Sequence, residues 1–452
     1  MRKLVIGTLL GIVYVHSADN VASMFEEGKA YGNIKYYYIQ TDKQNNIPHK
    51  DTSANAHAIG GTLGFKTAPL YGLSAQATFM TTNGFGLDGA VDTSIIGRDN
   101  GVRLDNGNPS GAIAQKSFTV LGEAFVNYDY NNFFINYGRQ VVKTPLIDAK
   151  TVRMLPSAVQ GARVGYHIED QGLTLEGDYL THFKQRTSND FINIVEHALG
   201  ANTKAITGDT KGDLLVASLL WKHDQFSASA YDYYAKNFLN SVYANINYTG
   251  TNDNYTYNLG FESIIQRSIG TANINLSSPG SLTGGKKINT EAFSFKGDIH
   301  YQESSFMMGY TYISSDDSVH DSLVLPWDGT PLYTNMITSN DLFVSNYGKG
   351  LTADSIYIGG TKSFKFSYTQ GYDFTGFKGI KTTFAYMIAD NDKFTKGKQK
   401  DFNAVLSYKY DKHFSIALKG IFVKNNTSAR EDGTISQLDD FQQYRVIANY
   451  RF

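Results

Sequence analysis

The chain has no cysteine, which excludes disulfide bonds and thiolate metal ligands. Beyond its N-terminus it has no long apolar run, and a transmembrane helix needs about 20 predominantly apolar residues. The formal net charge of −1 provides no basic field for nucleic acid. The mean hydropathy of −0.31 does not exclude a β-barrel, because half of each barrel strand faces water.

Proline is also scarce, with 8 in 452 residues, and each one lies between segments of alternating polarity. The prolines are Pro48, Pro69, Pro109, Pro145, Pro156, Pro279, Pro326 and Pro331. Proline cannot donate a hydrogen bond to a sheet ladder. This placement therefore favours a chain of continuously paired strands.

Tyrosine and phenylalanine are abundant, with 31 and 28 copies. They contribute to strands with one apolar face, most clearly in residues 444–452. There Tyr444, Val446, Ala448, Tyr450 and Phe452 fall on one face, and Arg445, Asn449 and Arg451 fall on the other. Such a strand suits a wall between lipid and water. A terminal Phe is also a signal that outer-membrane barrel-assembly machinery reads.

The same alternation recurs along the chain and predicts an all-β, transmembrane antiparallel β-barrel of about 18 strands. The expected strands are 30–40, 57–67, 72–81, 117–129, 132–139, 160–168, 172–183, 213–223, 226–235, 239–248, 255–266, 290–302, 305–314, 362–372, 379–388, 400–410, 414–424 and 442–452. Short turns alternate with long external loops at 82–116, 140–159, 184–212, 267–289 and 315–361. Within one loop, Ser188 to Gly200 has the capping pattern of a short helix.

The first residues have the layout of a secretory signal peptide. Arg2 and Lys3 precede an apolar stretch from Leu4 to Val15, and a small-residue cleavage site follows. We therefore expect residues 1–17 to be a signal peptide and residues 18–452 to form one barrel. The expected location is the outer membrane of a Gram-negative bacterium.

Two stretches resemble the OprD-type substrate-specific outer-membrane porins. The first combines Gly138-Arg-Gln140, Thr144-Pro-Leu146, Asp148, Arg153-Met-Leu-Pro156 and Gln160-Gly161, and the second combines Tyr372-Asp-Phe374, Gly376, Gly379 and the strand through Tyr386. The last strand is similar too. The resemblance implies an 18-stranded monomeric channel, an inward-folded third loop that forms a constriction, and a ladder of basic residues that guides small carboxylates or amino acids.

The 140–159 loop and its flanks supply the candidate constriction residues Arg139, Lys143, Asp148, Lys150, Arg153 and Arg163. A fixed Arg in a narrow lumen orients a carboxylate, and a nearby Asp suits an ammonium group. The alternative is that these charges belong to a solvated loop braced against the wall.

Strand parity places a second set in the lumen wall: Lys35, Lys381, Lys409, Lys419, Arg445 and Arg451. The inward acidic residues Glu123, Glu176 and Asp178 are candidates for a facing wall. The alternative is that these charges only keep the lumen wet.

We expect a passive channel for small polar solutes, anionic or zwitterionic, and neither an enzyme nor a cofactor or metal site. Gly280-Ser-Leu-Thr-Gly-Gly-Lys286 lacks the Ser/Thr of a phosphate-binding loop, because Lys287 follows. Expected partners are outer-membrane lipid and lipopolysaccharide, the solutes and the assembly machinery, with a monomeric or trimeric state. Two alternatives stay open: a general diffusion porin with only charge preference, and a barrel whose long loops serve adhesion.

Overall fold

Eighteen antiparallel strands form the wall of the structure, a computed structural model that describes residues 18–44, 52–84, 97–98, 115–149, 152–337, 344–345, 356–393, 397–427 and 440–452. The wall strands are β1 Lys29–Gln44, β2 Thr52–Lys66, β3 Leu73–Asn83, β6 Phe118–Tyr130, β7 Phe133–Gln140, β8 Ala158–Ile168, β9 Leu173–Lys184, β11 Leu214–His223, β12 Phe226–Ala235, β13 Leu239–Asn252, β14 Tyr255–Ser268, β15 Asn289–Tyr301, β16 Ser304–Ile313, β20 Thr361–Gly371, β21 Ile380–Asn391, β22 Gly397–Lys409, β23 Phe414–Thr427 and β24 Asp440–Arg451. A nineteenth member of the sheet, β10 (Ile192–Asn193), pairs with β9 alone. All the predicted strands are present.

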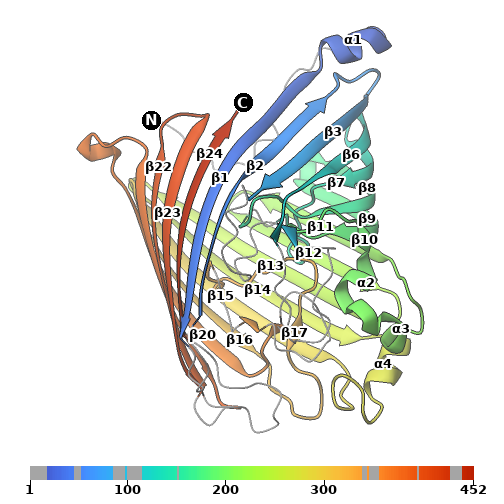
Figure 1. Cartoon of the computed structure of the whole chain (residues 1–452), viewed down its shortest axis with the longest axis vertical. Helices are drawn as coiled ribbons and strands as arrows, with labels where there is room; N and C mark the ends of the chain where they lie inside the picture. Colours follow the sequence, from blue (N-terminus) through green and yellow to red (C-terminus); the bar gives the residue numbers. More distant parts are fainter. Residues whose placement is uncertain are drawn as a thin grey trace.

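The first and last strands pair and close the sheet (Figure 1). Their register places Ile34 opposite Tyr450, and the backbones of Gly32 and Phe452 exchange two hydrogen bonds of 3.1 Å. The predicted pairing of the terminal strands is therefore confirmed. Closure leaves no wall strand with an unpaired edge, which a sheet within lipid requires.

Alternate side chains face opposite sides of this wall, as predicted. On β24, Tyr450 is 46% exposed on the outside, whereas Arg445 is 1% exposed on the inside. Leu418 on β23 and Phe384 on β21 repeat the exposed apolar pattern. The outer surface is consequently apolar, and charged side chains such as Arg445 face the inside, which is the arrangement of a barrel in a membrane.

Several strands run further than predicted at the loop end of the barrel. For example, β1 extends to Gln44 and β3 extends to Asn83. Their extra residues are polar on both faces, so the alternation that reveals the membrane-spanning part is absent there. Register shifts near Thr78 and Gln160 also reverse the parity locally, because a bulge adds one residue to one strand.

The two ends of the barrel differ as the loop lengths predict. Short turns such as 131–132 and 224–225 lie at the end that carries helix α1 (Val21–Glu26), and the long connections lie at the other end (Figure 1). That second end carries α2 (Ile194–Leu199), α3 (Thr203–Thr207) and α4 (Thr271–Leu276).

Helix α2 is the short helix expected within 188–200. The Asn193 side chain accepts hydrogen bonds from the backbone N–H groups of Val195 and Glu196, and Gly200 ends the helix. The predicted signal peptide, residues 1–17, lies outside the described residues. Among the residues that the structure describes, no helix has the length and apolar character needed to cross a bilayer.

The two faces of β23 can be compared at one depth with Leu418→Arg and Ala417→Arg. Leu418 faces lipid, so the arginine there should lower the free energy of unfolding by about 2–4 kcal/mol. Ala417 faces the lumen, where water hydrates a guanidinium group, so the matched variant should lose less than half as much. Denaturant titration in phospholipid vesicles measures both, and equal losses would contradict the assigned faces.

Candidate functional site: the lumen and its inward loops

Three long loops fold into the barrel and meet at Trp327, which is 1% exposed. Trp327 belongs to the 314–360 connection, and its backbone carbonyl accepts a hydrogen bond of 3.1 Å from Asp148 N–H of the 141–157 loop. Its indole N–H donates to the carbonyl of Ile194, in the 185–213 connection, at 3.1 Å. Burial of one large side chain against all three segments makes them a single packed unit.

The 141–157 loop contacts distant parts of the wall, as an inward-folded loop must. The Tyr233 hydroxyl of β12 accepts a hydrogen bond from Leu146 N–H at 3.2 Å. Further along the loop, Tyr37 of β1 donates to the Val152 carbonyl at 3.1 Å, and the Lys35 ammonium donates to the Arg153 carbonyl at 2.7 Å. The loop therefore passes through the lumen between β12 and β1.

The 314–360 connection is bound to the inner wall at several depths. Gln266 of β14 exchanges two hydrogen bonds with the backbone of Val324, of 2.7 and 2.8 Å. Deeper along the same strand, the Glu262 carboxylate accepts the Tyr333 N–H at 2.9 Å. Sequence reasoning placed this segment outside the barrel, but much of its described part lies within it.

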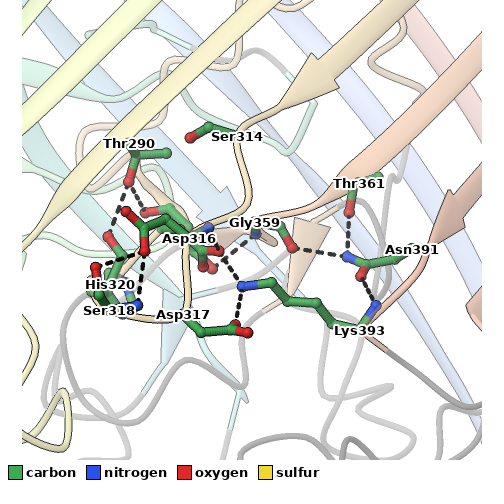
Figure 2. Close-up of polar contacts among 12 residues, drawn as sticks. Thr290, Ser314, Asp316, Asp317, Ser318, His320, Gly359, Thr361, Asn391 and Lys393 are labelled. Atoms are coloured by element: carbon green, nitrogen blue, oxygen red, sulfur yellow. Dashed lines mark hydrogen bonds and ion pairs between the residues drawn. The ribbon is translucent and has the colours of Figure 1, made fainter.

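The base of the same connection is tied to the rim by the contacts that Figure 2 shows. Lys393 forms ion pairs with Asp321 and, at 2.8 Å, with Asp317. The Ser318 hydroxyl and N–H both donate to Asp316, and these hydrogen bonds lower the pKa of its carboxyl group. These charged contacts fix where the loop turns into the lumen.

The six predicted lumen-wall cations lie on five adjacent strands. In the row nearest the loop end, Lys419 lies directly opposite Arg445. One row closer to the turn end, Lys381 lies opposite Ser407. The next row contains Lys409, Ser415, Asn449 and Lys35 in sequence across β22, β23, β24 and β1, and Arg451 follows below. Inward positions in these rows carry no carboxylate among the described residues. The result is a continuous basic wall, defined here as those six cations.

Two of the three acidic residues expected in the facing wall have a cation beside them. Glu176 and Asp178 lie next to Arg163 on the neighbouring strand, at 3.1 and 2.9 Å. Arg163 is thus a neutralised cation, because adjacent strands place opposite charges side by side. Glu123, on β6, accepts hydrogen bonds from Thr78 and from Val141 N–H.

The other predicted constriction residues are dispersed along the loop and its flanks. The Arg139 guanidinium lies 4.4 Å from the ring centroid of Phe191 and donates to Gln160 at 3.3 Å. Lys143 is exposed, Asp148 is half-buried, and Arg153 donates to the neighbouring Val152 carbonyl at 3.3 Å. Lys150 lies outside the described residues.

Sequence reasoning missed Trp327, Tyr37 and Glu262 as residues that position the loops. The sequence did contain a signal for Trp327, because 323–327 is an apolar run that ends in one of only two tryptophans, inside a supposed external loop. Tyr37 and Glu262 lie at inward positions of wall strands, where parity gives the direction but not the partner.

A closed barrel with an apolar outside, a polar inside and inward loops is an outer-membrane channel. The chain belongs to a particular family of these channels. Residues 22–452 match the family model described as outer membrane porin, OprD family. OprD-family porins are Gram-negative outer-membrane channels for small solutes, and membership of this family points to a channel rather than an enzyme.

Solved structures from Pseudomonas aeruginosa share the fold. OccK9 (OpdG) is 14% identical with a TM-score of 0.74, over 95% of this chain and 99% of that chain. OpdO is 16% identical with a TM-score of 0.69, over 95% and 98%. OpdK, solved with vanillate, is 13% identical with a TM-score of 0.68, over 95% and 99%. No curated protein matches the sequence.

Trp327→Ala tests whether the three loops form one unit in the lumen. Loss of a fully buried tryptophan should cost their packing about 3–5 kcal/mol, so the loops should loosen and single-channel conductance should rise. The barrel itself should still fold. Trp221→Ala, at the turn end of β11, removes the other tryptophan and should leave conductance unchanged. Equal conductance in both variants would mean that Trp327 does not hold the loops.

Proposed function

We propose that this channel selects small anionic solutes, above all carboxylates, and that the basic wall attracts and guides them. The observation that carries the proposal is the row-by-row succession of cations from Arg445 and Lys419 to Arg451, without an intervening inward carboxylate among the described residues. A solute carboxylate moving along such a wall passes from one cation to the next.

The unequal pairing of the two charge signs supports a net positive field. Asp178 and Glu176 share Arg163, and Asp298 of β15 lies 3.5 Å from the Lys296 ammonium and 2.8 Å from the His300 ring. Glu176, Asp178 and Asp298 therefore each have a cationic partner, whereas five cations of the basic wall form no ion pair with a described residue: Lys381, Lys409, Lys419, Arg445 and Arg451. Low-dielectric surroundings focus the remaining field into the pore.

The inward loops support selection over free diffusion. The 141–157 loop lies against Lys35 and Tyr37, so a solute on the basic wall must pass close to it. Close passage matters because screening in water weakens charge interactions beyond about 10 Å at 0.1 M salt. Vanillate, with which the similar structure of OpdK was solved, is a carboxylate, and this agrees with the proposed solute class.

Lys409→Gln and Lys419→Gln test the basic wall. The wild-type channel should prefer chloride to potassium, and each variant should reduce the permeability ratio severalfold, with a larger loss in the double variant. Reversal potentials in a salt gradient across planar bilayers measure this ratio. Lys362→Gln is the matched control, because this exposed lysine pairs with Asp392 on the outer rim. An unchanged ratio in the double variant would contradict the proposal.

Block of the open channel tests the solute class. A small carboxylate added to one side should interrupt the current of the wild-type channel, and its uncharged amide should not. The double variant Lys409→Gln and Lys419→Gln should shorten the carboxylate blocks, because two of the guiding charges are gone. Identical, unblocked currents with both solutes would instead support a general diffusion porin.

A further inference from the structure

A groove of about 580 Å³ lies on the outside of the barrel near its loop end. Its lining includes Lys400 of β22, Lys424 of β23 and the rings of Tyr386, Phe402 and Phe422. Parity assigns these side chains to the outer surface, since Leu406 and Leu418 on the same strand faces are 44% and 45% exposed. The groove therefore lies outside the lumen and apart from the proposed solute path.

Lys400 and Lys424 are direct cross-strand partners in this groove. Side chains directly opposite each other have Cβ atoms about 5 Å apart, and two like charges in that position repel. Neither ammonium group is in an ion pair with a described residue, whereas the exposed Lys362 on the same rim is paired with Asp392 at 2.8 Å. An anion between the two lysines would remove the repulsion.

Two carboxylates also line the groove, on its β1 and β24 side, and both are engaged elsewhere. Asp42 accepts hydrogen bonds from the Ser53 hydroxyl at 2.5 Å and from the Gln40 amide at 3.2 and 3.3 Å. Asp440 accepts the Asn425 N–H at 2.6 Å. The groove thus has a cationic side on β22 and β23 and an acidic side that is held by its own neighbours.

The surface directly below the lysines is aromatic. One row closer to the membrane centre, Tyr386, Phe402 and Phe422 are cross-strand neighbours on three adjacent strands. The ring centroids of Phe402 and Phe422 are 6.2 Å apart, and those of Phe384 and Phe402 are 6.3 Å apart. This order matches a lipid molecule, because its charged headgroup would lie at the row of lysines and its acyl chains at the row of aromatic rings.

We propose that this groove binds a phosphorylated lipid of the outer leaflet, with its phosphate between Lys400 and Lys424 and its acyl chains over Phe402 and Phe422. Phosphate suits the two ammonium groups as a shared counter-ion. The acyl chains cover aromatic surface that would otherwise contact bulk lipid without a defined partner.

The test measures binding of fluorescent bisphosphorylated lipid A to the refolded barrel in phosphatidylcholine vesicles. Lys400→Gln and Lys424→Gln should each weaken binding about fivefold, and the double variant roughly 30-fold. These factors correspond to about 1 kcal/mol of binding free energy per lysine at a membrane surface. Phe402→Ala should also weaken binding. Lys362→Gln is the control and should bind as the wild type does. Unchanged single-channel conductance shows that each variant is folded.

Two further probes identify the bound chemistry. Lipid A without its phosphates should bind the wild-type barrel no better than the double variant binds the phosphorylated form. Inorganic phosphate at millimolar concentration should not displace the lipid. The proposal is overturned if the double variant retains wild-type affinity or if dephosphorylated lipid binds equally well. It is also overturned if inorganic phosphate competes fully while Phe402→Ala has no effect, since the groove is then a simple anion site.

Discussion

Backbone hydrogen bonding within lipid is the constraint on which the rest of this structure depends. The bilayer core offers no water to an unpaired N–H or C=O group, so a sheet that crosses it must close on itself. The pairing of β1 with β24 meets this requirement, with Ile34 opposite Tyr450 near the end of the chain. Closure fixes one face of each strand toward lipid and the other toward the lumen, and both proposed binding surfaces follow from that division.

The lumen is narrowed by a hydrophobic cluster to which the three inward loops contribute Leu146, Ile194 and Trp327. The loops also form hydrogen bonds with inward side chains such as Gln266 and Glu262. The buried Gln266 and Glu262 side chains are thereby satisfied by loop backbone groups, which is why they are tolerated. The same contacts hold the 141–157 loop beside the basic wall.

Most of the wall was predictable from the sequence, because side-chain alternation with a period of two is a local property. It identified the strands and the lipid face, and it assigned six cations, including Lys35 and Arg451, to inward strand positions. It did not identify the partners of Arg163, since cross-strand pairing depends on register between strands. It also placed 315–361 outside the barrel, because loop length alone does not reveal that Val324 and Tyr333 bind inner-wall residues.

The sequence by itself determined a membrane barrel with aromatic strands, short turns at one end and long loops at the other. Only the tertiary structure decided which charges are compensated and which are not. Arg163 is neutralised by Glu176 and Asp178, whereas Lys419 lies opposite Arg445 and neither forms an ion pair with a described residue. The physical reason is that electrostatic interaction depends on distance in space, and strand register and loop folding set that distance.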